Sequence, residues 1–200
     1  MPMFVQRIHV SLLAMMIACC GLLLAQSTSA PANSGGSGAT KIAPADQTFL
    51  RKAAQGGTAE VELGKVAQQN GGSDQVKQFG ERMVADHTTV NDTLKQLAAS
   101  KGVSVPAQPD SADQREKARL QKLKGAQFDR AYFDYMVRDH QKDVSEFRKE
   151  ANSAKDPDVK AFAQQTLPTL EEHLKMAQQA QKNLKASSGA SGTSTSASSY

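Results

Sequence analysis

The chain has 200 residues, with 24 Lys and Arg against 20 Asp and Glu, and a formal charge of +4 at pH 7. The basic residues alternate with acidic ones and do not cluster with aromatics, so we expect no nucleic-acid partner. Both cysteines, Cys19 and Cys20, lie in an N-terminal apolar run, which leaves the rest of the chain without disulfides, cysteine-ligated zinc or cysteine nucleophiles.

The first 30 residues have the parts of a secretory signal. Arg7 precedes an apolar run over residues 8–25, and the small residues AQSTSAPA follow it. This pattern predicts an exported protein, periplasmic or attached to the envelope, with a cleaved signal over residues 1–30. Two alternatives stay open: lipidation of Cys19, and retention of the run as an anchor. Contact with a membrane is expected only through such a lipid or anchor, and the sequence does not identify a protein partner.

Residues 46–186 predict a single all-α domain, a bundle of four long helices. Ala, Gln, Lys, Glu and Asp dominate this segment and runs of β-branched residues are missing, which favours helix over sheet. Residues 31–45 are rich in Gly, Ser, Ala and Pro, and residues 187–200 are similar, so we expect a flexible linker and a disordered tail on either side of the domain.

The first two long helices are separated by two glycines. The first is expected to have Asp46 as its N-cap and to end at Asn70. Small residues on its inward face would allow close packing. The second is expected to begin at Ser73 and to end before Gly102.

A long connection then leads to the other two helices. Ser111 and Gln114 form a capping box for a short helix ending near Gly125, which suits a crossover in a bundle. The third long helix contains residues 128–147 and ends near Ser153.

The fourth long helix is expected to begin with Asp156 as N-cap and Pro157 in its first position. Pro168 lies inside this helix and predicts a kink about one turn before His173, because it cannot donate to the carbonyl of Gln164.

Each long helix carries one ionisable residue near the middle of its inward face: Glu60, His87, His140 and His173. Side-by-side packing would bring their midpoints to one level of the core. A buried carboxylate or imidazole without a partner costs several kcal/mol, so this layer must be satisfied internally, by water or by a metal ion.

Three imidazoles and a carboxylate suit one tetrahedral or five-coordinate transition-metal ion, with copper, zinc and iron as candidates. Met83 and Met136 each lie one turn before a histidine and would add thioethers that favour Cu(I). Asp143 lies one turn after His140, as a further ligand or as an acceptor for an imidazole N–H. The acidic residues directly before the histidines turn toward helix edges, where they would support an imidazole or face solvent: Asp86, Asp139 and Glu172.

The same polar layer is compatible with two further functions. A hydrogen-bonded Glu/His network with buried water would account for these residues without metal, in a structural or stress-related interaction bundle. A metal-dependent oxidoreductase would require an ion with an open coordination position. No catalytic Ser, phosphate loop or dinucleotide motif is present, so the sequence does not favour an enzyme.

The segments MVADH (83–87), FDRAYFDYMVRDH (128–140) and LPTLEEHL (167–174) resemble an exported bacterial family, domain of unknown function 4142. The resemblance covers about residues 46–185. It implies a ferritin-like four-helix fold and brings no established activity.

Residues 128–144 are also similar to another exported helical family, domain of unknown function 305, which has some copper-binding members. Asp139 stands where that pattern has its first histidine, which weakens an inference of copper. Ferritin-like di-iron proteins need carboxylates three residues before two histidines, and Val84 and Leu170 occupy those positions. We therefore expect a single-ion site or none.

Overall fold

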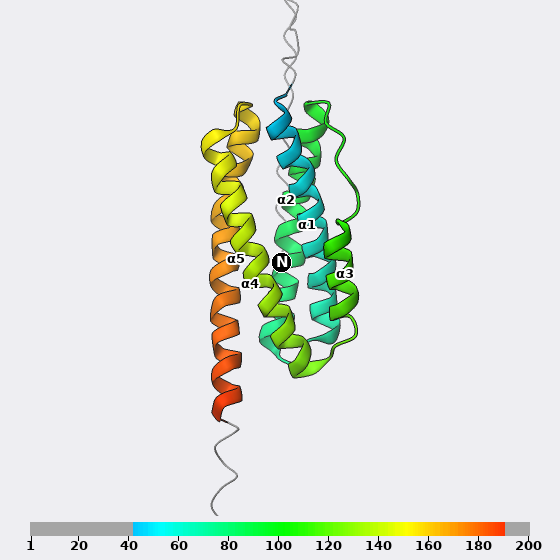
Figure 1. Cartoon of the computed structure of the whole chain (residues 1–200), viewed down its shortest axis with the longest axis vertical. Coiled ribbons are helices and arrows are strands. Elements are labelled where there is room, and N and C mark those ends of the chain that lie inside the picture. The colour runs from blue at the N-terminus through cyan, green and yellow to red at the C-terminus, as the bar shows by residue number, and fades with distance from the viewer. Residues whose placement is uncertain (1–41, 191–200) are drawn as a thin grey trace, which may run out of the picture. The chain divides into compact units, whose positions relative to one another are not determined.

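The computed structural model describes residues 42–190, with the side chains of residues 188–190 left out (Figure 1). The predicted signal, most of the predicted linker and most of the predicted tail lie outside this range. The described residues form an all-α domain without strands; one isolated bridge pairs Gly71 with Gly125. None of the helices in this range is both long enough and apolar enough to cross a membrane.

Four long helices and one short helix make up the domain, as the sequence predicts. They are α1 (Pro44–Asn70), α2 (Asp74–Ser100), α3 (Ser111–Leu120), α4 (Gly125–Ser153) and α5 (Pro157–Ala190). The last helix continues past the predicted end of the domain at residue 186, and it runs through Pro168.

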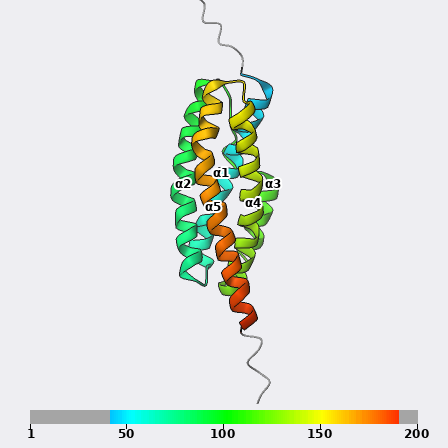
Figure 2. The same ribbon diagram turned by 90° about the vertical axis from the view of Figure 1, so that its left-hand side faces the viewer.

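The helices are arranged as two hairpins packed side by side. Short turns join α1 to α2 and α4 to α5, and the members of each pair pack along their length. Between hairpins, α1 packs on α4 and α2 packs on α5, so α2 and α4 are diagonal neighbours (Figure 2). The connection from α2 to α4 returns along the bundle with α3 against α1 (Figure 1). One long crossover of this kind is typical of ferritin-like bundles.

The predicted ends of the first and third long helices, at Asn70 and near Ser153, are confirmed, and so are three further helix ends. Ser73 caps α2 by accepting a hydrogen bond from the amide of Val76 at 3.3 Å. Asp156 caps α5 through Oδ1, which accepts from the amides of Asp158 and Val159. Gly102 has φ of 65°, a left-handed conformation in which glycine lets the chain leave α2 without strain.

The predicted N-cap Asp46 is wrong. Helix α1 begins at Pro44 with Ala43 as its N-cap, and Asp46 lies in the first turn, buried. Its Oδ2 instead accepts hydrogen bonds from the amides of Lys155 at 3.1 Å and Asp156 at 2.7 Å, in the turn before α5. The carboxylate thus stabilises free amides on the other hairpin, a partner that local sequence does not reveal.

The turn between α1 and α2 is likewise capped by a buried aspartate of the other hairpin. Asp129 on α4 accepts hydrogen bonds from the amides of Gly72 at 2.8 Å and Ser73 at 3.0 Å. Each hairpin therefore supplies a buried aspartate that caps the turn of the other hairpin, at opposite ends of the bundle.

The predicted capping box at Ser111 is also wrong, by one residue. Asp110 is the N-cap of α3 and accepts from the amides of Ala112 and Asp113, while the side chain of Gln114 donates to the carbonyl of Pro109. Asp110 is preferred because its carboxylate reaches two free amides. Helix α3 ends at Leu120, before the predicted end near Gly125.

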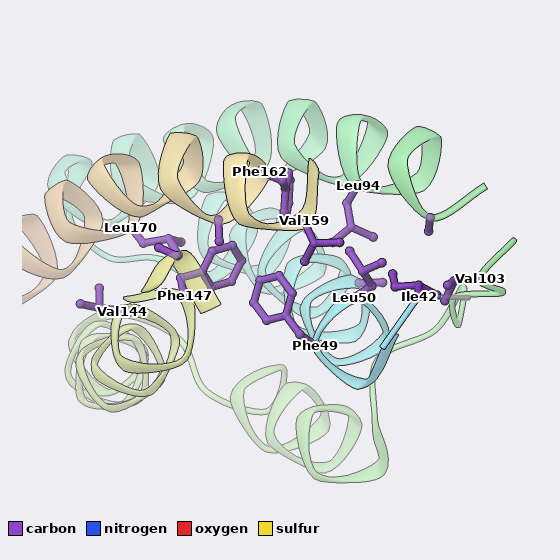
Figure 3. Packing of buried hydrophobic residues seen from close by; sticks show 14 residues of the cluster. Ile42, Phe49, Leu50, Leu94, Val103, Val144, Phe147, Val159, Phe162 and Leu170 are labelled. Carbon is purple, nitrogen blue, oxygen red and sulfur yellow. The ribbon is translucent and has the colours of Figure 1, made fainter. Parts of the chain in front are cut away.

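Two apolar clusters fill the interior. The first, around Phe49, Phe147 and Phe162, joins the start of α1 and α5 to the end of α2 and α4 (Figure 3). Phe49 and Phe147 pack edge to face with ring centroids 4.9 Å apart. The second cluster includes Phe79 and Tyr132 and joins the opposite helix halves. On every long helix, the polar residue singled out by the sequence lies between residues of the two clusters.

Candidate metal centre

The structure brings the four predicted polar side chains together. Glu60 comes from α1, His87 from α2, His140 from α4 and His173 from α5. All four are buried, none more than 3% exposed. The predicted polar layer therefore exists, and two hydrophobic clusters separate it from the ends of the bundle.

Contacts within the layer are short. His87 Nδ1 lies 2.9 Å from Glu60 Oε2, and His140 Nε2 lies 3.3 Å from Glu60 Oε1. The second contact lacks hydrogen-bond geometry, so it leaves both of its atoms unpartnered. The three imidazole centroids are 5.3 to 6.0 Å apart.

The hydrogen bonds of His140 and His173 fix which nitrogen carries the proton. His140 Nδ1 lies 3.1 Å from the carbonyl oxygen of Met136, which can only accept, so Nδ1 donates and Nε2 keeps its lone pair. His173 Nε2 lies 2.8 Å from Asp86 Oδ2. Burial raises the pKa of Asp86, but the hydrogen bonds from Arg82 and His173 together outweigh it and lower the pKa, so this carboxylate is ionised and accepts the proton of Nε2.

Each of the three histidines keeps one ring nitrogen without a partner: His87 Nε2, His140 Nε2 and His173 Nδ1. The three residues can each offer a ligand atom such that all the atoms lie within 4.8 Å of one another. Unpartnered buried nitrogens are unfavourable, and a shared cation or water would satisfy them. A hydrogen bond from the other nitrogen to a carboxylate or carbonyl is what metal-binding histidines usually make.

Burial keeps these histidines neutral at pH 7. It lowers the pKa of His87 to about 4, of His140 to about 3 and of His173 to about 4. Neutral imidazole is the form that binds metal ions, so none of the three histidines has to lose a proton before an ion is bound.

Burial acts on Glu60 in the opposite direction and raises its pKa to about 8, with a smaller contribution from Asp113. Without a cation, Glu60 is therefore protonated at neutral pH. A bound cation would favour the carboxylate, so ion binding at this layer would release a proton from Glu60.

A cavity of about 280 Å³ adjoins the layer. Exposed residues Lys52, Asp110 and Lys142 line it, as do the buried residues Glu60 and His87. The cavity therefore extends from the surface of the described domain to the polar layer.

The other predicted ligands lie near the layer, and their role stays a prediction. Met83 and Met136 are fully buried members of the second apolar cluster, where both contribute to the packing of the core. Asp143 lines the cavity beside Glu60, and burial followed by the charge of Glu60 raises its pKa well above the usual range.

The three acidic residues next to the histidines have different surroundings. Asp86 contacts His173, and Glu172 pairs with Arg82 at the surface, as expected for helix edges. Asp139 was missed as a site residue: Glu60, Asp139 and His140 can each offer a ligand atom within 4.8 Å of the others. Its signal in the sequence was Asp143 four residues later, since the two acids share one face of the helix.

The sequence profile of a family described as Domain of unknown function (DUF4142) matches residues 31–180. The chain belongs to this family. No curated protein matches the chain. The DUF4142 domain is similar to the crystal structure of a DUF305 fragment from Deinococcus radiodurans, with a TM-score of 0.63 at 16% identity, covering 71% of this chain and 98% of that one. At this identity the similarity establishes a shared helical fold.

The residues of this DUF4142 domain fit a metal ion. Three neutral imidazoles with unpartnered nitrogens and an adjacent carboxylate form a buried His/Glu group that could hold one. The donors are mainly nitrogen, which suits a transition metal better than Mg²⁺ or Ca²⁺.

Proposed function

We propose that this protein binds a single transition-metal ion, copper, zinc or iron, in the core of its helical bundle. The observation that carries the proposal is the set of three buried, unpartnered imidazole nitrogens, one on each of three helices. Glu60 completes the donor set with an oxygen. His87, His140 and His173 would be the principal ligands, since their low pKa values keep them ready to bind at neutral pH.

The proposal is tested by metal binding to protein purified without a His tag. Wild type is expected to bind one equivalent of Zn²⁺ or Cu²⁺. His140→Ala is expected to weaken binding by more than about 100-fold, because loss of groups that only support a ligand already costs about 10–100-fold. Thr166→Val is the matched control: this residue is buried, lines the same cavity as Glu60 and His87, and belongs to neither donor group. If wild type and His140→Ala bind equally little, the proposal fails.

A metal-free polar layer is the second candidate. It is favoured by the hydrogen bonds already present, from His140 to Met136, from His173 to Asp86 and between His87 and Glu60. In this case the layer fixes the register of the helices, in a structural or interaction bundle, and added metal ions leave the melting temperature unchanged.

We also propose that the protein acts in the cell envelope after export. The support is the sequence over residues 1–30, with Arg7, an apolar run and small residues after it. Mass spectrometry of the mature protein from fractionated cells tests this: a cleaved signal gives a shortened, unmodified N-terminus in the periplasmic fraction. Lipidation at Cys19 or an intact N-terminus in the membrane fraction would indicate an anchor, and an intact chain in the cytoplasm would contradict export.

A further inference from the structure

The acidic cavity beside the polar layer contains buried oxygen atoms without partners. Glu60 is 2% exposed and its Oε1 has no hydrogen-bond partner; Asn91 is 8% exposed and its Oδ1 has none either. Both residues line the cavity. Both oxygen atoms lack a partner, and a water molecule or a cation in the cavity would satisfy them.

Acidic side chains outnumber basic ones around the cavity. Two lysines, Lys52 and Lys142, line it together with six acidic residues: Glu60, Asp110, Asp113, Asp139, Asp143 and Glu146. Carboxyl oxygens are ligands that divalent cations accept, so this lining suits a cation better than an anion. The apolar clusters on both sides of the polar layer offer no comparable polar path.

Two possible donor groups have members in the cavity lining, and the groups share one residue. The first consists of His87, His140 and His173; the second consists of Glu60, Asp139 and His140. The second group is richer in oxygen, and Glu60 and Asp139 both line the cavity. An ion arriving with bound water would therefore meet the carboxyl groups of Glu60 and Asp139 before it meets His173, which does not line the cavity.

We propose that this cavity is the route by which a divalent cation reaches the three histidines, and that Glu60, Asp139 and His140 form a transient binding site along it. The inference rests on the proposed metal binding. Carboxylate oxygens replace part of the water shell of the ion at the transient site. The ion then exchanges these oxygens for nitrogens of His87 and His173 while His140 stays bound. The ion therefore keeps at least one protein ligand at every step.

The test compares the rate of metal uptake with the affinity at equilibrium. Rapid mixing of Zn²⁺ with the metal-free protein, followed with a chromophoric chelator, gives the rate, and a competition titration gives the affinity. Asp139→Asn keeps the size of the side chain and removes its carboxyl group. It is expected to slow uptake about tenfold, because the transient site loses an oxygen ligand, and to leave the affinity within about threefold, since Asp139 is outside the final ligand set.

Two further variants keep the test independent of any folding defect in Asp139→Asn. Glu146→Gln changes another residue of the cavity lining and is also expected to slow uptake. Asp92→Asn is the matched control, because Asp92 is an exposed aspartate of α2 outside the cavity.

The possible results of these experiments distinguish a failure of the proposed entry route from a failure of the proposed metal site. Unchanged uptake in Asp139→Asn and Glu146→Gln would overturn the route and leave the proposed metal site intact. A loss of affinity in Asp139→Asn without a slower uptake would also overturn it, because Asp139 would then be a permanent ligand. If wild type takes up no Zn²⁺, the proposed function fails and this inference fails with it.

Discussion

Asp86 fixes the position of the proton on the imidazole of His173. Its carboxylate lies 2.8 Å from His173 Nε2 and directs the lone pair of Nδ1 into the polar layer. Replacing Asp86 with Ala is expected to weaken metal binding by about 10–100-fold, because the imidazole loses its fixed proton position. Competition titration measures the change.

Glu172→Ala is the matched control for Asp86→Ala. Glu172 also pairs with Arg82, and it is the neighbour of His173 in sequence, but it is exposed and its carboxylate points to the surface pair. We expect it to leave the affinity unchanged. Equal losses in the two variants would assign the effect to Arg82 or to general charge, and would contradict a specific role for Asp86.

The raised pKa of Glu60 predicts that the stability of the metal-free protein depends on pH. Its pKa is raised from 4.5 to about 8 by burial, so between these values the folded state binds more protons than the unfolded state. The stability tied to protonated Glu60 is full below pH 4.5 and is lost as the pH rises toward 8. Relative to Glu60→Gln, wild type should lose about 1 kcal/mol of unfolding free energy per pH unit in this range.

Urea denaturation of wild type and Glu60→Gln at pH 5, 6, 7 and 8 measures this difference. Saturating Zn²⁺ should reduce the slope, because the bound ion keeps Glu60 ionised in the folded state. A constant difference between wild type and variant across this pH range would show that Glu60 does not titrate there.

The sequence was enough to find the residues of the polar layer and was not enough to find Asp139. Glu60, His87, His140 and His173 each interrupt an apolar face with helical period, and such a face turns toward the core whatever the partner is. Asp139 is rotated 100° from His140 toward the helix edge. Whether that edge meets solvent or the cavity depends on how the neighbouring helices pack, which no local pattern records.

At the scale of the helices, glycines set how closely α1 and α2 approach. A Cβ on Gly64 would lie 2.6 Å from the carbonyl oxygen of Gly80, and a Cβ on Gly80 would lie 2.7 Å from the carbonyl oxygen of Gly64. Because backbone cannot move aside as a flexible side chain can, Gly64→Ala is expected to destabilise the fold by about 1–3 kcal/mol.

Gly56→Ala provides the control on the same helix. A Cβ there meets no heavy atom within 4 Å, so the better helix propensity of alanine should stabilise the protein by about 0.5–1 kcal/mol. Urea denaturation at one pH measures both variants. A stable Gly64→Ala protein would mean that the helices separate at little cost.

Helix ends were predictable where the cap is local and not where it is distant. Ser73 and Asp156 bind amides two or three residues ahead in their own chain segment, so their signals are visible in sequence. Asp46 binds amides at Lys155 and Asp156, on the opposite hairpin. An aspartate before a helical run looks the same in both situations, which is why the prediction placed it at the wrong helix.

At the scale of the whole molecule, a bound ion would connect the two hairpins. Zn²⁺ at 100 times its dissociation constant should stabilise the folded state by about 2.7 kcal/mol, because it binds the folded state only. Thermal unfolding should show a higher melting temperature that a chelator reverses. His140→Ala should show no such increase, and an equal increase in this variant would indicate binding elsewhere.

The bundle architecture was predictable because its pieces are long and amphipathic. Four apolar faces of similar length, two tight turns and one long connection leave few arrangements other than a bundle with a crossover. The position of α3 against α1 was not predictable, since only Leu120 of this helix is buried and its sequence carries little apolar pattern. This position also places Asp113 on the cavity wall.

The two hairpins are attached to each other at three heights. Asp46 and Asp129 hold the turns at opposite ends, and Asp86 of one hairpin meets His173 of the other between them. Sliding one hairpin past the other by a single helical turn would break all three attachments at once. Hydrogen bonds at both ends of the bundle therefore help to set the relative heights of the histidines before any ion binds.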